Sequence, residues 1–164
     1  MGRGEHENRD VPTVLVERLP HAEGLPLPGY ATPGSAGADL CAAIDEPMVV
    51  HMGAVSLIPT GLKLAIPAGY EVQVRPRSGL ALKAGLTLVN TPGTIDSDYR
   101  GEVSVIVTCV KEEPCTINRG DRIAQLVVAP VSQAAWIEAD TLPETERGVG
   151  GFGHTGVHME ARPR

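Results

Sequence analysis

The sequence predicts an all-β protein, either a closed barrel or a two-sheet jelly roll, and three observations support this. First, Gly and Pro contribute 19 and 14 of the 164 residues, a density that indicates short elements joined by tight turns rather than long helices. Second, apolar and polar residues alternate at 71–75 and 102–105, as in half-buried strands. Third, aromatic residues make up only 3% of the chain, so the core is expected to consist of aliphatic side chains.

The predicted strands are runs rich in aliphatic residues that end at turn signals. They cover residues 11–19, 49–58, 62–66, 71–75, 86–90, 102–107 and 123–131. Combinations of Gly, Pro and Asn predict turns between them at 59–61, 67–69, 91–93 and 118–120. A single stretch is typical of a helix: Ser78 is expected to cap a short helix that runs to Gly85.

The chain is expected to have three regions. Residues 1–10 are polar and are read as a disordered tail, without the apolar centre of a secretory signal. Residues 11–142 are predicted to form the β domain. Residues 143–164 are rich in Gly and charged side chains and are read as a flexible C-terminal arm. No apolar run approaches the ~18–20 residues that cross a bilayer, so no membrane partner is expected.

Charge and cysteine content narrow the possible partners. The net charge is −6, which disfavours binding to a nucleic-acid backbone but allows a small anion held by a few Arg residues or a metal. The three cysteines are an odd count without a C-x-x-C pair. This pattern predicts neither a disulfide framework nor a zinc site, and it is typical of a reducing cytoplasm.

Two motif matches near the C-terminus have weak support. Residues 148–153 fit G-x-G-x-x-G, but a dinucleotide-binding fold needs a following helix and an acidic residue about 20 positions on, and the chain ends at residue 164. His154 and His158 have the spacing of a helical metal pair. The glycines around them make a helix there improbable, so metal binding is not predicted.

Five short segments combine Gly with charged or hydroxyl residues in ways that strand packing does not require. They are residues 36–40, 76–81, 93–102, 120–126 and 147–156. Singly, each has a plainer interpretation: a hairpin turn with a surface ion pair, a helix cap, an Asx turn or a loose tail. Together and in this order, they closely resemble the five motifs of the homotrimeric deoxyuridine triphosphatases, the dUTPases.

The resemblance implies a function and an assembly. The expected reaction is Mg²⁺-dependent hydrolysis of dUTP to dUMP and pyrophosphate, which limits uracil in DNA and supplies dUMP for thymidylate synthesis. The expected fold is a jelly-roll-like β-barrel with one short helix and a flexible arm. Three copies would form a homotrimer whose active sites each take motifs from all three subunits, and the arm would close over the site.

The resemblance also implies a role for individual residues. Asp96 would be the general base that activates the water attacking the α-phosphorus, because a carboxylate is ionised at neutral pH. Tyr99 would pack on the deoxyribose and exclude a 2′-hydroxyl, and Phe152 would stack on uracil. Asp39 would hold Mg²⁺ through a water, with no direct protein ligand. The remaining substrate-binding residues would be Arg77, Ser78, Gly79, Asn90, Thr94, Ile95, Gln125, Arg147, Gly153 and Thr155.

Two other functions remain open at this level. dCTP deaminases share the fold, but they need an additional acid–base Glu and a site for the cytosine amino group. A non-enzymatic β trimer could act as a nucleotide sensor. The sequence of residues 96–99 and the complete arm favour the triphosphatase. A comparison of ammonia release with pyrophosphate release would distinguish the two enzymes.

Overall fold

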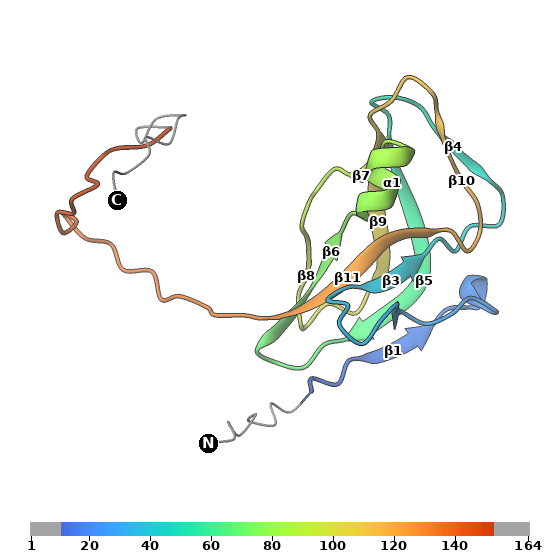
Figure 1. Ribbon diagram of the computed structural model, residues 1–164. Helices are drawn as coiled ribbons and strands as arrows, with labels where there is room; N and C mark the ends of the chain where they lie inside the picture. The colour runs from blue at the N-terminus through green and yellow to red at the C-terminus, as the bar shows by residue number, and fades with distance from the viewer. Residues whose placement is uncertain (1–10, 153–164) are drawn as a thin grey trace, which may run out of the picture. The chain divides into compact units, whose positions relative to one another are not determined.

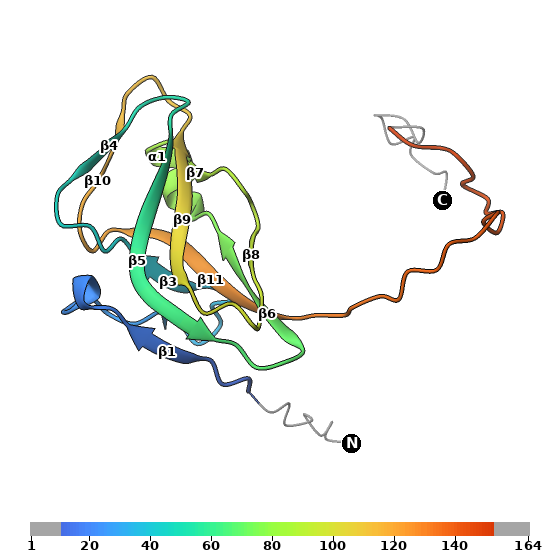
Figure 2. The same ribbon diagram turned by 180° about the vertical axis from the view of Figure 1, so that it is seen from behind.

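The computed structural model describes residues 11–152 and has the predicted all-β architecture (Figures 1 and 2). It contains one short α-helix, α1 (Ser78–Lys83), and one 3-10 turn, η1 (Pro20–Ala22). The strands are β1 (Leu15–Arg18), β2 (Gly29–Tyr30), β3 (Ala38–Cys41), β4 (Met48–Val50), β5 (Val55–Ala65), β6 (Tyr70–Arg75), β7 (Leu86–Leu88), β8 (Gly93–Ile95), β9 (Glu102–Cys109), β10 (Cys115–Ile117) and β11 (Arg122–Pro130).

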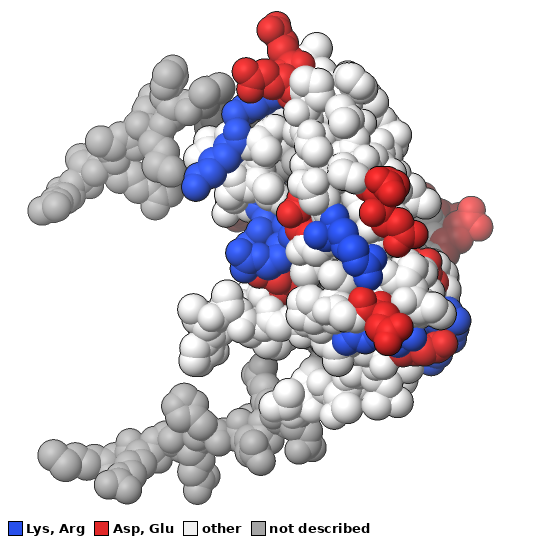
Figure 3. Space-filling model, turned by 90° about the vertical axis from the view of Figure 1, so that its right-hand side faces the viewer, with Lys and Arg blue, Asp and Glu red and all other residues white. Residues whose placement is uncertain are grey.

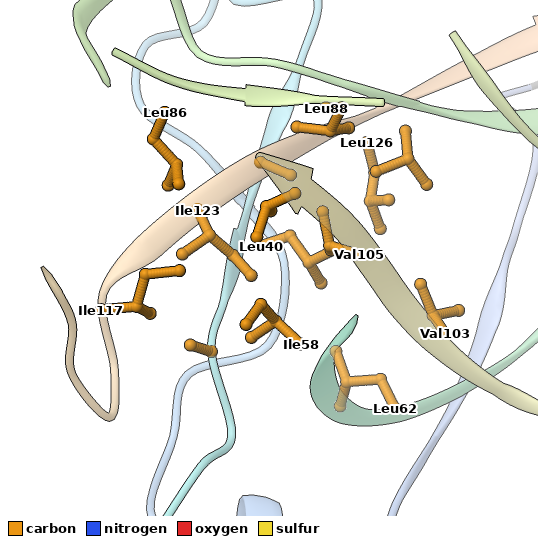
Figure 4. Packing of buried hydrophobic residues seen from close by; sticks show 14 of the residues in the cluster. Leu40, Ile58, Leu62, Leu86, Leu88, Val103, Val105, Ile117, Ile123 and Leu126 are labelled. Carbon is orange, nitrogen blue, oxygen red and sulfur yellow. The ribbon is translucent and has the colours of Figure 1, made fainter. Parts of the chain in front are cut away.

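The strands form two main sheets around one aliphatic core. One sheet has the order β1-β5-β9-β7, the other has the order β2-β3-β11-β6-β8, and β10 pairs with β4 beside them. All pairs of these strands are antiparallel. Alternate side chains of β9 are buried, which is the period-2 pattern that predicted this strand. Leucine, isoleucine and valine side chains from both sheets meet in the centre (Figure 4).

The predicted turn at 59–61 is wrong, because β5 continues through it. The register with β9 shifts between Pro59 and Lys63, so the segment is a bulge within one long strand, a place where a strand tolerates Pro. Thr60 is buried there, and its hydroxyl donates to the carbonyl of Val103 at 2.6 Å. Gly61 has a φ of +64°, which favours glycine. Local turn signals thus marked a bend in a strand.

The helix begins one residue earlier than predicted. Arg77, not Ser78, is the N-cap: its backbone is extended, and its carbonyl accepts the amides of Leu80 and Ala81 at 3.1 and 3.0 Å. The side chain of this N-cap makes no capping hydrogen bond. Gly85 follows the helix with a φ of +74°, as expected of a residue that ends a helix.

Several short strands have no counterpart in the prediction. Strands β2, β3, β8 and β10 contain two to four residues, too few for an alternating pattern to stand out. The segment predicted as one strand at 49–58 is instead the end of β4, a turn and the start of β5. Long-range pairing defines these elements.

The cysteines differ from expectation. Cys109 and Cys115 form a disulfide, although no disulfide was predicted from the spacing. The chain turns back between β9 and β10, which brings the two Cα atoms to 6.0 Å. Cys41 is free and half-buried. Burial, followed by the charge of Asp39, raises the pKa of its thiol above the ordinary value.

Backbone contacts divide the chain into two units, with a boundary between Ser132 and Gln133. The described part of the second unit, 133–152, contains no helix or strand. Its large apolar side chains are exposed, including Trp136 at 93% and Phe152 at 114%. The expected arm boundary at residue 143 stays a prediction. Within residues 11–152, no helix has the length and apolar character needed to cross a membrane.

Candidate active site

A hollow of about 370 Å³ lies beside β8 and contains the predicted base-binding residues. We call it the β8 hollow. Asn90, Tyr99 and the strand itself line one part of it, and residues of β5, β6, β7 and β9 line the rest. The full set is Leu57, Val74, Leu88, Asn90, Gly93, Thr94, Ile95, Asp96, Tyr99, Glu102, Val103, Ser104, Val105 and Ile106.

A tight turn after β8 holds the tyrosine over the hollow. The amide of Tyr99 donates to the carbonyl of Asp96 at 3.2 Å, and its hydroxyl donates to the carbonyl of Glu102 at 3.2 Å. Arg100 donates to the carbonyls of Ser97 and Tyr99 at 2.7 and 2.8 Å. These contacts fold residues 96–102 into a compact unit, so the position of Tyr99 depends on both ends of the turn.

Asp96 is the carboxylate within the predicted base-binding group. Its side chain is exposed and has no hydrogen-bond or ion-pair partner among residues 11–152. An exposed carboxylate is ionised at neutral pH and can accept a proton from water. The geometry therefore allows Asp96 to act as a base toward a molecule in the β8 hollow.

A second hollow, of about 530 Å³, lies beside α1, and we call it the α1 hollow. Arg77, Ser78, Gly79 and Gln125, all predicted to bind phosphates, line it together with Asp39. The other lining residues are Ala31, Ser35, Ala36, Gly37, Leu80 and Lys83. The resemblance did not single out Lys83, although it supplies a second cation to this wall.

Asp39 connects two arginines at the α1 hollow. Its Oδ1 is 2.8 Å from Nε of Arg77, and its Oδ2 is 2.9 Å from Nη1 of Arg122. Arg77 also donates from Nη1 to the carbonyl of Arg122 at 3.1 Å. The carboxylate is only 19% exposed, so these charge-assisted contacts are less screened than surface pairs. They orient both guanidinium groups before any ligand binds.

Gln125 fits closely against the loop that precedes β3. Its Nε2 donates to the carbonyl of Pro76 at 2.9 Å, which turns its amide oxygen toward Gly37. A Cβ atom at Gly37 would lie 2.9 Å from the Gln125 amide carbon, closer than real contacts allow. Glycine is therefore required for this close approach.

One face of the molecule carries mixed rather than separated charges. On the face shown in Figure 3, basic and acidic side chains are interspersed without a broad patch of one sign. A bound anion would be recognised by individually placed cationic groups rather than by a wide positive field.

The predicted residues of the arm are only partly described. Arg147 donates from Nε to the carbonyl of Gly150 at 2.9 Å, which curls the chain around Gly148. Phe152 is exposed in the second unit. Gly153 and Thr155 lie outside the described residues.

The structure also identifies residues that the motif pattern left unassigned. Arg122 lies within the motif at residues 120–126, but only the pairing of β3 with β11 shows that it shares Asp39 with Arg77. Gly101 is the second: a Cβ atom there would lie 2.5 Å from Cζ of Tyr99. In the sequence, its position two residues after Tyr99 was the available signal.

The two hollows are separate in one chain. No residue lines both of them, so the predicted base-binding and phosphate-binding groups do not share a wall. A nucleotide that used both groups could therefore take them from different copies of the chain.

Comparison with known proteins identifies the family. A family model of dUTPases matches residues 23–156. The deoxyuridine 5′-triphosphate nucleotidohydrolase of Beijerinckia indica is 60% identical over 147 residues, covering 88% of this chain and 92% of that protein. The enzyme with the same name from Maricaulis maris is 57% identical over 146 residues, covering 88% and 96%.

Solved structures agree with this assignment. A mutant dUTPase of Staphylococcus bacteriophage 80alpha, bound to dUpNHpp, has a TM-score of 0.77 and 25% identity, covering 88% of this chain and 99% of that one. A mutant dUTPase of phage phi11, described with a structural Mg(II) ion, has a TM-score of 0.67 and 24% identity, covering 79% and 97%. The extent of the family match and the identity to the curated relatives show that the chain belongs to the dUTPase family.

Proposed function

We propose that Asp96 is the general base in the hydrolysis of dUTP to dUMP and pyrophosphate, the reaction that this chain catalyses as a dUTPase. One observation carries the proposal: Asp96 lies in the β8 hollow with Asn90 and Tyr99 and has no partner among residues 11–152. Its carboxylate would take a proton from the water that attacks the α-phosphorus. Removal of this proton makes the water oxygen a stronger nucleophile at the start of the reaction.

The β8 hollow would select the base and the sugar. Asn90 and the backbone of 94–96 would bind the uracil edge, and the close walls around Gly93 would exclude the thymine methyl group by steric contact. Tyr99 would pack on the deoxyribose. Its ring would leave no room for a 2′-hydroxyl, which is how the site would discriminate against UTP.

The α1 hollow would bind the triphosphate. Arg77, Ser78 and the backbone at Gly79 would donate hydrogen bonds to phosphate oxygens, and Gln125 would orient the phosphates and the attacking water. The contact between Asp39 and Arg77 supports this role, because an oriented guanidinium loses less entropy when it binds a phosphate.

Mg²⁺ is the cofactor that the family implies, and the residues present fit it in one way. Residues 11–152 hold no group of three His, Cys, Asp or Glu side chains suited to a metal. Each oxygen of Asp39 accepts one contact from an arginine and can still accept a hydrogen bond from a metal-bound water. Asp39 would thus hold the ion through water, and the ion would offset negative charge on the phosphates.

The proposed active form is a homotrimer with shared active sites. The separate hollows support it, because a neighbouring copy could bring an α1 hollow to a β8 hollow. Exposed apolar residues beside the β8 hollow, such as Leu57 at 60%, also favour a covered surface. Arg147, Phe152, Gly153 and Thr155 would complete each site when the arm closes. We also propose a cytoplasmic location, where the enzyme would supply dUMP for thymidylate synthesis, although the disulfide between Cys109 and Cys115 removes the cysteine pattern as support for it.

Replacing the base tests the chemical role. Asp96→Asn should retain the fold and dUTP binding but lose about 10²–10⁴-fold in kcat, the usual contribution of general base catalysis. Pyrophosphate release measures turnover, and calorimetry with dUpNHpp measures binding. Asp98→Asn is the matched control, because it removes a neighbouring exposed carboxylate from the same turn. Near-normal turnover of Asp96→Asn would remove Asp96 from the role.

Mixed assembly tests whether sites are shared. Asp96→Asn and Arg77→Ala chains should each be nearly inactive. If residues 96 and 77 of one site come from different subunits, random assembly of equal amounts restores about a quarter of the sites. Co-refolded mixtures should then regain activity that the separately refolded proteins lack. Inactive mixtures, despite trimers in light scattering, would show that both residues act from one chain.

A further inference from the structure

The side chain of Glu102, at the start of β9, accepts two hydrogen bonds although it is partly exposed. Its Oε1 accepts the backbone amide of Gly61 at 2.7 Å and Nε2 of His21 at 2.8 Å. The side chain is 27% exposed, and that of His21 is 34% exposed. Because the acceptor is a carboxylate, His21 must carry its hydrogen on Nε2. Glu102 thus binds two separate segments of the framework.

Both of those segments are fixed independently. Gly61 belongs to the bulge of β5, and a Cβ atom at this position would run into Ala22 of η1. Arg119 donates to the carbonyls of His21 and Glu23 at 2.7 and 2.9 Å, which ties the residues around η1 to the turn before β11. Glu102 is therefore attached to rigid partners rather than to a mobile surface.

The same residue also contacts Tyr99, which we call the sugar gate because its ring would exclude a 2′-hydroxyl. The carbonyl of Glu102 accepts the Tyr99 hydroxyl at 3.2 Å, and Glu102 is part of the wall of the β8 hollow. Its side chain thus fixes the end of the turn on which the Tyr99 hydroxyl rests. The other end of the turn is fixed by β8.

The sheet itself does not depend on the Glu102 side chain. Next to it, the buried hydroxyl of Thr60 donates to the carbonyl of Val103 at 2.6 Å and joins β5 to β9. The backbone of Glu102 pairs with Lys63, and beyond the bulge the ladder continues from Pro59 and Ser104. Removing the carboxylate should leave these contacts in place and loosen only the end of the turn.

We propose that Glu102 is a positioning residue for substrate selection: held by Gly61 and His21, it keeps Tyr99 where the ring excludes a 2′-hydroxyl. The inference rests on the proposed role of Tyr99 as the sugar gate. It adds two residues, Glu102 and His21, to which the proposed site assigns no hydrogen bond with the base or the phosphates. Their effect is on the ratio between substrates rather than on the chemical step.

The test is the ratio of kcat/KM for UTP to kcat/KM for dUTP, measured on one preparation of each full-length variant. This ratio does not depend on the fraction of active enzyme, so a merely destabilised variant would not change it. Glu102→Ala should raise the ratio about tenfold, the usual effect of losing a charged hydrogen-bonding group. His21→Ala should raise it less, since the bond to Gly61 remains. The amide oxygen of Glu102→Gln can still accept both hydrogens, so that variant should stay within about threefold of wild type.

Two further variants make the outcome decisive. Glu17→Ala is the matched control, because it removes a carboxylate from the same sheet that pairs with Lys63 at 3.5 Å and makes no hydrogen bond to the turn at 96–102. A ratio raised equally by Glu17→Ala and Glu102→Ala would overturn the inference. Tyr99→Ala measures the gate itself. If it raises the ratio and Glu102→Ala does not, the gate stands and Glu102 has no positioning role; if Tyr99→Ala has no effect, the gate and the inference both fail.

Discussion

Gly101→Ala should damage substrate recognition without reaching the core. The ring of Tyr99 folds back over residue 101, where a Cβ atom would lie 2.5 Å from Cζ and 2.9 Å from Cε2. The residue is not in the left-handed region, so alanine fits the backbone and only the ring is in the way. Tyr99 is 47% exposed, which leaves the ring free to move outward.

The size of the effect follows from this distance. To reach an ordinary contact of 3.4 Å, Cζ must retreat by about 0.9 Å, and the hydroxyl must leave the carbonyl of Glu102. A misplacement of ~1 Å at a positioning group can cost about 10²-fold in rate. We therefore expect kcat/KM for dUTP to fall about 10–100-fold. The free energy of unfolding should change by less than about 1 kcal/mol, since alanine also restricts the unfolded chain.

Pyrophosphate release with dUTP and UTP, together with urea unfolding, measures both quantities. Gly34→Ala is the control, because a Cβ atom at that position meets nothing within 4 Å. If Gly101→Ala kept wild-type kcat/KM for dUTP and wild-type rejection of UTP, the ring position would not govern recognition, and the steric argument would be refuted.

Two further predictions concern Gly37, which lines the α1 hollow, and Cys41 of β3. Gly37→Ala should push Gln125 away from Pro76 and lower kcat/KM for dUTP about tenfold or more. Calorimetry with dUpNHpp should show weaker binding, and unaltered binding would contradict the close fit. Alkylation of Cys41 by iodoacetamide should be slow at pH 7 and rise about tenfold per pH unit toward pH 9, because a raised pKa keeps the thiolate scarce. Mass spectrometry measures the alkylation rate, and a rate that reaches a plateau below pH 8.5 would argue against the raised pKa.

How far the sequence predicts the fold depends on the length of each element. Strands β6, β9 and β11 bury alternate or continuous aliphatic residues over six to nine positions, and the pattern alone predicts them. Strand β8 has three residues and exists because Val72 and Val74 of β6 pair with it. Pro59 and Gly61 are typical turn residues, yet long-range pairing with β9 makes them part of a strand. Tertiary contacts override local signals here.

The candidate site divides in the same way. The roles of Arg77, Asp96 and Tyr99 are predictions that come from the order of their motifs along the chain. The arrangement around them could not be predicted in this way, since it depends on distances across strands. Asp39 and Arg122 are 83 residues apart, and their contact follows from the pairing of β3 with β11. The role of Gly101 likewise follows from the ring that covers it.

The acidic balance of the chain bears on how it would bind a highly charged anion. With a net charge of −6, long-range attraction cannot supply the affinity. Asp39 reduces the local positive charge further, because it pairs with both Arg77 and Arg122. In the proposed site its benefit would be orientation, because Arg77, held at 2.8 Å, would lose little freedom on binding a phosphate. Affinity in such a site would come from prepared geometry and the implied Mg²⁺ rather than from excess positive charge.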